Sequence, residues 1–477
     1  MLIETVDAAR LEVSPTLDPK RRAKLGQFMT PGPTAKFMAQ MFDNLPEHVR
    51  LLDAGAGMGA LTAAFVVEAC NRADAPKSIS VTCYEVDEDL ASILSSTLDT
   101  CADVCREAGV EFSSEIIRDD YILRSAEPHA GDQVSHNVAL LNPPYGKIRS
   151  NSKWRLALRQ CGIETVNLYS AFVALANQQI EAGGQIVAIT PRSFCNGTYY
   201  EPFRKQILDD CALEKLHVYE SRRSTFKDDD VLQENMIFHL TRGGDQGDIA
   251  LSTDKQDARA VPFEEIVRPE DKHRFIRLPI DGNSLAAKIQ ALPCTLADLG
   301  IKASTGRVVD FRTREHLMKE PEGKTVPMIH AQHFKDGAIN WPLKDFKKCN
   351  YLADSEETAK LMVPAGTYVI VKRFSAKEEK RRLVGALYDG GKAGFDNKTN
   401  YFHMNGGGLP KDVAKGLLAF LSSEAVDQYF RIFSGHTQVN ATDLRNLHYP
   451  SLEQLRQIGM SNSGPDEAVE AILQPAT

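Results

Sequence analysis

Short apolar runs alternate with amphipathic stretches between residues 50 and 242 of the chain. Each run is bounded by turn residues and predicts a strand, while the stretches between the runs have the spacing of helices. Strands joined by helices form right-handed crossovers in a parallel, doubly wound sheet. No long helix precedes the last run, which allows that strand to lie antiparallel beside its predecessor. The expected strands are 50–54, 78–87, 111–121, 137–145, 183–191, 213–220 and 235–242.

The pattern changes after the turn-rich segment 242–248. Turn dipeptides multiply there, strand-like runs such as "TYVIVKRF" follow, and the alternation of strand and helix does not return. We therefore expect an α/β domain at 1–250 and a mixed α+β domain at 251–458. The final segment, 459–477, is polar and predicts a loose tail with one short helix.

The composition is ordinary for a soluble globular protein: of 477 residues, 43% are apolar and 25% are charged. No apolar run reaches the roughly 18 residues that a membrane span needs, and the N-terminus has no basic segment typical of a secretory signal. The nine cysteines form no C-x-x-C pair, so we predict reduced thiols, a cytoplasmic protein and no metal site.

The net charge of −8 argues against indiscriminate nucleic-acid binding. The charge is unevenly distributed, because residues 271–400 contain 23 Lys and Arg against 16 Asp and Glu, a balance of +7 that leaves −15 for the rest. This basic segment suggests a face that meets a polyanion, although charged runs are usually just solvated surface.

A glycine-rich turn follows the first expected strand, where "LLDAGAGMGALT" places Asp53, Gly55 and Gly57. Glycine lets the backbone approach a ligand there, and Glu85 at the end of the next strand can accept hydrogen bonds from ribose hydroxyls. The spacing differs from the G-x-G-x-x-G of NAD sites, and Asp53 would repel phosphates but suit a cationic ligand. These residues favour S-adenosylmethionine (SAM), which has a sulfonium, an ammonium and no phosphate. An NAD site and a plain tight turn are the alternatives.

Two more candidate ligand residues end the third strand, in "RDDY". Asp120 can bond an adenine amino group, and Tyr121 can lie along the ring. An exposed strand-end turn is the structural alternative.

The fourth strand ends in "LLNPPYGKI", which offers acceptors and few donors. The Asn142 side-chain oxygen and the Pro143 carbonyl can both accept from an exocyclic amino group. Pro143 and Pro144 lack N–H groups and stiffen the loop, and Tyr145 offers an aromatic face for a base. Acceptors aimed at charge that develops in the transition state promote methylation of that nitrogen. A bare turn is the alternative.

Together, "GQFMTP", "DAGAGMG", "YEVD", "RDDY" and "NPPYGKI" resemble, in this order, the gamma-class DNA adenine-N6 methyltransferases of restriction–modification systems, the PstI/TaqI-type modification enzymes. The resemblance spans nearly the whole chain and is strongest over 25–245. It implies a Rossmann-like SAM-dependent methyltransferase domain at 1–250, with Phe28, Thr30 and Pro31 also at the cofactor. It further implies a target-recognition domain at 251–458, and Phe226 packed against a flipped adenine opposite Tyr145.

By the same resemblance the partners are double-stranded DNA and a separate restriction endonuclease, and we expect a monomer. Two segments, 371–383 and 433–451, resemble parts of the family's target-recognition half. The first has six Lys or Arg in eleven residues. Without a role in DNA binding, the first segment would be an exposed, salt-bridged surface and the second would contain a helix cap. The candidate DNA contacts are Lys372, Arg373, Lys380, Arg381, Arg382, Gln438, Asn440 and Arg445.

Other substrates remain open at the level of sequence. N-P-P-Y also occurs in enzymes that methylate protein glutamine or RNA guanine N2, but those generally lack some 200 further residues. Cytosine-N4 enzymes usually carry Ser in place of Asn142. A non-catalytic SAM-binding or DNA-binding regulator would not need Asn142 and Tyr145 intact.

Overall fold

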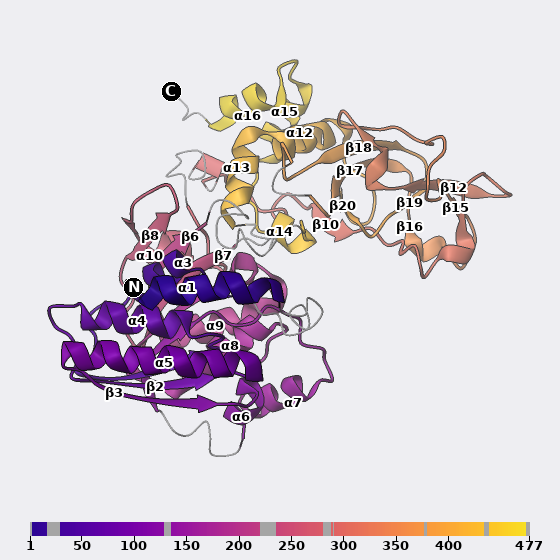
Figure 1. The fold of residues 1–477 in the computed structure, drawn as a ribbon. Coiled ribbons are helices and arrows are strands. Elements are labelled where there is room, and N and C mark those ends of the chain that lie inside the picture. Colours follow the sequence, from indigo (N-terminus) through magenta and orange to yellow (C-terminus); the bar gives the residue numbers. More distant parts are fainter. Residues whose placement is uncertain are drawn as a thin grey trace. The chain divides into compact units, whose positions relative to one another are not determined.

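The chain folds into two compact units, Met1–Ile280 (unit 1) and Asp281–Thr477 (unit 2), in a computed structural model (Figure 1). The structure describes residues 2–16, 29–127, 135–219, 235–279, 288–289, 291–375, 379–433 and 438–473. No helix in these ranges is both long enough and apolar enough to cross a bilayer.

Unit 1 is built on a nine-stranded sheet whose order is β3-β2-β1-β4-β5-β7-β6-β8-β9. Neighbouring strands from β3 to β5 are parallel, whereas β7 is antiparallel to both β5 and β6. This confirms the doubly wound sheet with an antiparallel last strand. The strands are β1 (His48–Ala54), β2 (Ser78–Tyr84), β3 (Glu111–Ile117), β4 (His136–Leu141), β5 (Ile180–Pro191), β6 (Cys211–Val218), β7 (Asn235–Arg242), β8 (Ile249–Thr253) and β9 (Arg259–Val261).

Helices cover the sheet because their apolar stripes must be buried against it. In α5, Leu90, Leu94, Leu98, Cys101 and Cys105 recur at helical spacing and are buried. Figure 1 shows α1, α4 and α5 in one layer over the sheet. The helices of unit 1 are α1 (Leu2–Val13), α3 (Gly32–Ala39), α4 (Ala60–Cys70), α5 (Glu88–Ala108), α6 (Tyr121–Ser125), α7 (Lys153–Gln160), α8 (Leu168–Gln179), α9 (Glu201–Asp210) and α10 (Phe263–Ile266).

The first unit extends further along the chain than the expected boundary at residue 250. Two short strands, β8 and β9, continue its sheet, with β8 parallel to β6 and β9 antiparallel to β8. Ile249, Leu251 and Val261 are buried in its core, so these residues belong with the first unit on physical grounds.

Unit 2 contains two sheets, with strand orders β10-β20-β17-β18-β14-β13 and β11-β15-β12-β19-β16. The strands are β10 (Lys302–Thr305), β11 (Leu317–Met318), β12 (Thr325–Ile329), β13 (Phe334–Lys335), β14 (Ala338–Ile339), β15 (Tyr351–Ala353), β16 (Met362–Val363), β17 (Gly366–Lys372), β18 (Gly385–Gly390), β19 (Ala393–Phe395) and β20 (Thr399–His403). The expected mixed α+β composition of this half is therefore present in the structure.

Among its described residues, unit 2 also contains the helices α12 (Lys411–Ser422), α13 (Glu424–Phe433), α14 (Ala441–Arg445), α15 (Leu452–Met460) and α16 (Pro465–Leu473). A Cβ on Gly416 of α12 would come within 1.8 Å of the Leu455 carbonyl oxygen, so α12 and α15 approach backbone to backbone. The expected loose tail includes α16, whose Val469 and Leu473 are buried in the core of unit 2. This part of the tail is therefore packed, because its apolar residues recur at helical spacing.

Candidate active site

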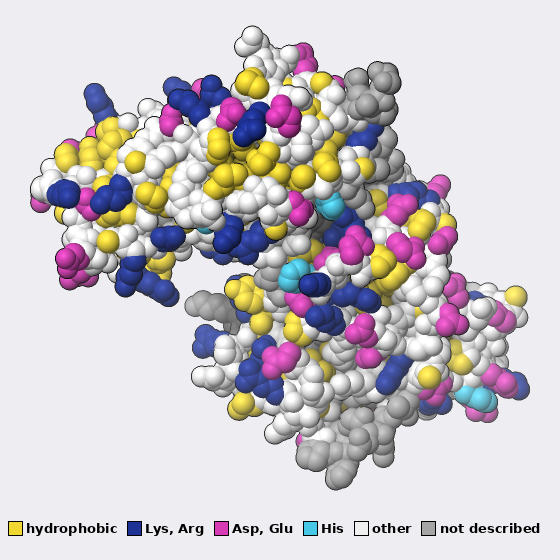
Figure 2. Space-filling view, turned by 180° about the vertical axis from the view of Figure 1, so that it is seen from behind, with side chains coloured by type: hydrophobic (Ala, Val, Ile, Leu, Met, Phe, Trp, Pro, Cys, Tyr) yellow, Lys and Arg dark blue, Asp and Glu magenta, His cyan; other side chains and the backbone are white. Residues whose placement is uncertain are grey.

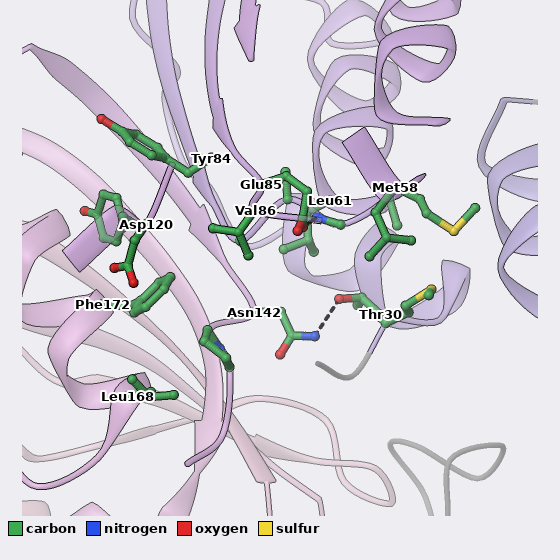
Figure 3. A pocket seen from close by; sticks show the side chains of 18 of the residues that line it. Thr30, Met58, Leu61, Tyr84, Glu85, Val86, Asp120, Asn142, Leu168 and Phe172 are labelled. Carbon is green, nitrogen blue, oxygen red and sulfur yellow. Dashed lines mark hydrogen bonds between the residues drawn. The ribbon is translucent and has the colours of Figure 1, made fainter. Parts of the chain in front are cut away.

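A cavity opens at the carboxyl ends of β1, β2 and β4 in unit 1, where ligands bind in doubly wound sheets (Figure 3). Its walls come from α1, the segment before α3, the turn after β1, the ends of β2 and β3, and α7 and α8. The lining residues that carry the argument are Arg10, Thr30, Gly55, Gly57, Glu85, Asp119, Asp120, Tyr121, Asn142, Pro144, Trp154 and Phe172.

The glycine-rich turn forms one wall of the cavity. Gly55, Gly57 and Gly59 have φ angles of +80°, +58° and +85°, a region that favours glycine. The Gly55 N–H donates to the Tyr84 carbonyl at 2.9 Å, which ties this turn to the end of β2. A Cβ on Gly57 would have no heavy atom within 4 Å, so the turn leaves open space there.

Asp53 is enclosed beside this turn, whereas Glu85 holds the turn through backbone N–H groups. Asp53 is fully buried and does not line the cavity, and its Oδ2 accepts from the Thr62 hydroxyl at 2.7 Å. Burial raises the pKa of Asp53 to about 7. Glu85 does line the cavity, but its carboxylate accepts from the Gly57 N–H and the Asp87 N–H, both at 2.8 Å. Burial raises the pKa of Glu85 as well. The expected direct ligand contact of Asp53 is therefore corrected to a positioning role, because its side chain is enclosed.

The "RDDY" residues lie at the cavity, as expected. Asp120 caps α6, and its second oxygen accepts from the Trp154 indole N–H at 2.6 Å. The Tyr121 ring is buried between Tyr84 and Phe172, with both ring centroids at 4.9 Å, and its hydroxyl donates to Gln179. An aromatic and apolar wall of this kind suits a flat base. The sequence patterns did not single out Trp154, since it lies 34 positions from Asp120.

Asn142 stands at the end of β4 beside the segment that precedes α3. Its amide nitrogen donates to the Thr30 hydroxyl at 2.9 Å, and Figure 3 shows the amide oxygen pointing away from Thr30. Thr30 is 5% exposed, and Pro31 caps α3. Two motifs that are 112 positions apart thus meet at one hydrogen bond. With the nitrogen bonded in this way, the amide oxygen of Asn142 is the atom that faces away from Thr30.

The rest of the "NPPY" loop packs around Asn142. Pro144 lines the cavity, Pro143 is buried, and Tyr145 is 8% exposed with its ring edge-on to Tyr169 at 6.4 Å. Burial raises the pKa of the Tyr145 phenol well above its ordinary range. Its expected contact with a base stays a prediction. The remaining two candidates, Phe28 and Phe226, lie outside the described residues.

Comparison with known proteins gives the family. A family model described as an Eco57I restriction-modification methylase matches residues 102–226. The chain is 48% identical over 469 residues to the type II methyltransferase M.PstI of Providencia stuartii, covering 95% of this chain and 92% of the relative. The chain belongs to the type II methyltransferases of restriction–modification systems. It is also 43% identical over 478 residues to the type II methyltransferase M.BsuBI of Bacillus subtilis, covering 96% of this chain and 93% of that relative.

A solved cryo-EM structure of a DrdV–DNA complex shares the fold of this methyltransferase. The TM-score is 0.55 at 13% identity, and the match covers 96% of this chain and 59% of that one.

The cofactor of this methyltransferase is SAM, and the cavity fits it chemically. The space beside Gly57 admits a close ligand, and Glu85, Asp119 and Asp120 give the lining an acidic character that would oppose a pyrophosphate. Thr30, Gly55 and Asn142 line the cavity together with the aromatic wall. The expected cofactor residues other than Phe28 and Asp53 thus surround or adjoin one cavity.

The candidate DNA contacts of unit 2 come from two segments of the chain. The segments 371–383 and 433–451 lie side by side, since Phe374 pairs with Gln438 and the Val439 N–H donates to the Arg373 carbonyl at 2.8 Å. The Arg373 guanidinium donates to the Asn397 carbonyl. Asn440 is the N-cap residue of α14, and the Asn440 N–H donates to the Asp443 carboxylate.

Arg382 is corrected as a direct DNA contact, because its side chain is fully buried and its Nε donates to the Ser375 hydroxyl at 3.2 Å. Arg381 forms ion pairs with Glu424 and Asp466, at 2.9 and 3.2 Å. Lys372 lies 3.9 Å from Glu379, and Lys380 is exposed. Much of this basic run therefore serves the internal structure of unit 2.

A different group of basic residues gathers at the β10–β20 edge. Lys302 pairs in register with His403, and both Lys302 and Arg307 are exposed. Arg445 is exposed too, and its guanidinium donates to the Ala303 carbonyl at 2.7 Å. Burial and the three nearby cations lower the pKa of His403. Of this group, only Arg445 was expected from the sequence, because pairing across strands is not visible in a linear pattern.

Proposed function

We propose that this methyltransferase transfers a methyl group from SAM to N6 of an adenine flipped out of duplex DNA. The observation that carries the proposal is the placement of Asn142. It lies in the lining of the cofactor cavity, with its amide oriented by the hydroxyl of Thr30. A side-chain oxygen held in this way suits an exocyclic amino group that must be gripped beside a methyl donor.

The proposed chemistry assigns a role to each loop residue. When bound, SAM supplies an electrophilic methyl group. The Asn142 side-chain oxygen and the Pro143 carbonyl oxygen each accept a hydrogen bond from one N–H group of N6. This arrangement favours a tetrahedral nitrogen with a localised lone pair. The amino proton leaves after transfer, so no base is needed before it. Pro144 keeps the loop stiff, because a proline ring fixes φ.

Base flipping follows from where the target atom lies, since N6 is not accessible to such a cavity within a stacked duplex. We propose that the flipped adenine is held by Tyr145 and Phe226. The aromatic neighbourhood of Tyr145, which includes Tyr169 and the Tyr200 ring stacked on it at 5.7 Å, supports an apolar site at this position.

Unit 2 is proposed to read the target sequence. Its support is the exposed basic group of Lys302, Arg307 and Arg445 together with the paired segments that contain Arg373, Gln438 and Asn440. In Figure 2, Lys and Arg side chains gather along one edge of the surface that belongs to this unit. The proposal includes a monomer that acts in the cytoplasm, where host DNA lies, and protects that DNA from a separate restriction endonuclease.

The test is expression in a bacterial host without DNA methylation, followed by single-molecule sequencing of its DNA. We expect N6-methyladenine at one short recurring sequence. Asn142→Ala should abolish the mark and still bind S-adenosylhomocysteine in calorimetry, whereas the same substitution at exposed Asn71 should leave the mark intact. N4-methylcytosine, an unmodified genome or an active Asn142→Ala variant would contradict the proposal.

A further inference from the structure

Arg10 is a buried basic side chain at the cofactor cavity for which the mechanism above has no role. It lies on α1, is 4% exposed and lines the cavity together with Val6. Leu2, Val6 and Arg10 are the buried residues of α1 and recur every four positions, so an arginine occupies the end of an otherwise apolar stripe.

The position of Arg10 is fixed by contacts between α1 and α3. Asp7 accepts from the Arg10 Nε at 2.7 Å and from the Gly32 N–H at 3.0 Å. A Cβ on Gly32 would lie 3.2 Å from the Asp7 Cβ, so the two helices touch at this glycine. Gly32 follows Thr30 by two positions, and Thr30 orients Asn142. Arg10 is therefore anchored at the reacting end of the cavity, through Asp7 and the start of α3.

The charges of the cavity are asymmetric. Glu85, Asp119 and Asp120 line it, and Arg10 is the one Arg or Lys among the described lining residues. SAM carries a sulfonium, an ammonium and a single carboxylate. These acidic residues would repel the carboxylate, so that group needs a cationic partner.

We propose that Arg10 binds the α-carboxylate of SAM. Guanidinium matches a carboxylate in both charge and geometry, and Asp7 keeps the arginine in place. The proposal rests on SAM as the cofactor. The product S-adenosylhomocysteine keeps the same carboxylate, so Arg10 binds cofactor and product alike. Such uniform binding lowers Kd and KM without raising kcat.

The test compares two ligands that differ only in the carboxylate, S-adenosylhomocysteine and its decarboxylated analogue S-adenosyl-3-thiopropylamine. Calorimetry on the full chain should show that the native protein prefers the first by about 10- to 100-fold, the range of a charge-assisted pair. Arg10→Met keeps an apolar side chain of similar length. We expect it to weaken binding of S-adenosylhomocysteine by that factor and to leave the analogue unchanged, so that the preference falls to near one.

Two controls separate this role from a structural one. Lys36→Met removes a positive charge from the exposed face of α3 and should keep the preference of the native protein. In methylation assays, Arg10→Met should raise KM for SAM with kcat nearly unchanged. Equal loss of both ligands in Arg10→Met would mean that the arginine only supports the fold.

The native protein provides a test that needs no variant to fold. If it binds the two ligands equally well, or binds the decarboxylated ligand more tightly, the proposal is overturned. If it binds neither ligand, the assignment of the cofactor fails together with the proposal.

Discussion

Thr30 contacts the side chain of Asn142, which we propose holds the substrate amino group. An amide side chain can turn by half a rotation and exchange its oxygen for its nitrogen, which would place a donor where an acceptor is needed. The hydrogen bond from the Asn142 nitrogen to the Thr30 hydroxyl, at 2.9 Å, stabilises one of these two orientations. We therefore predict that Thr30 positions Asn142, in addition to lining the cavity.

Replacing Thr30 by valine should lower kcat by about 10- to 100-fold, because a misplaced acceptor loses transition-state stabilisation. Valine has the shape of threonine but no hydroxyl. Calorimetry should find S-adenosylhomocysteine bound nearly as well as in the native protein, and Thr30→Ser should recover most of the rate. A Thr30→Val enzyme with native kcat would show that the hydrogen bond has no part in orienting Asn142.

The motifs singled out in the sequence come together around one cavity, but the contacts of each side chain within it could not be predicted. Asn142, Thr30 and Gly55 line the same cavity, although their motifs are far apart in the sequence. Asp53 turned out to be enclosed, and Glu85 uses its carboxylate on backbone N–H groups. Motif spacing identifies the loop, but the partner of each oxygen depends on how the turn closes in three dimensions.

At the scale of elements, long periodic segments were predictable and short ones were not. β4 is buried throughout and is apolar from residue 138 to 141, so its pattern identified it as a strand. By contrast, β9 has three residues and is defined by its pairing with β8. Its place in the first unit follows from a tertiary contact, which no local pattern contains.

Asp396 joins several elements of unit 2 through one carboxylate. It follows β19, and its Oδ2 lies 2.7 Å from His330 Nδ1 and 3.0 Å from Lys348 Nζ. Lys348 also pairs with Asp310 at 2.7 Å. Burial raises the pKa of Asp396, but the His330 hydrogen bond and the Lys348 charge outweigh it, so the pKa falls to about 2. The ammonium of Lys348 thus supplies the positive charge that the carboxylates of Asp310 and Asp396 share.

The lowered pKa predicts the direction of a pH effect on stability. An unfolded aspartate has a pKa near 3.9, so the unfolded chain binds more protons between about pH 4 and pH 2. The stabilisation from Asp396 is therefore complete above pH 4 and is lost as the pH falls towards 2. At pH 7, Asp396→Asn should lower the free energy of unfolding of unit 2 by about 2 kcal/mol.

Calorimetric unfolding at a series of pH values checks this prediction. The difference between the native protein and Asp396→Asn should be large at pH 7 and should shrink below pH 4. Asp389→Asn is the matched control, because Asp389 pairs with Lys411 at the exposed surface and such pairs contribute little. A difference that persists unchanged at pH 2 would mean that packing, and not charge, makes Asp396 important.

For the whole molecule, the structure shows which side chains of the basic segment are buried, paired or exposed. The chain carries −8 in total, yet residues 271–400 have a balance of +7. The structure uses part of that excess internally, in buried Arg382 and paired Arg381. It leaves Lys302 and Arg307 exposed beside β10. Counting charges along the sequence therefore gives the local excess, but it does not show which of these side chains the fold leaves exposed.

We expect Lys302 and Arg307 to contact DNA phosphates. Each phosphate contact that is lost should reduce the slope of log affinity against log salt by about one. The double variant Lys302→Gln/Arg307→Gln should therefore flatten the slope by about two. Fluorescence anisotropy between about 50 and 200 mM salt measures this slope.

A duplex of arbitrary sequence suffices, because phosphate contacts carry no sequence information. Lys335→Gln controls for net charge, since β13 lies at the opposite edge of the same sheet from β10. A slope that the double variant leaves unaltered, or that Lys335→Gln lowers equally, would exclude the β10 edge as the phosphate-binding surface.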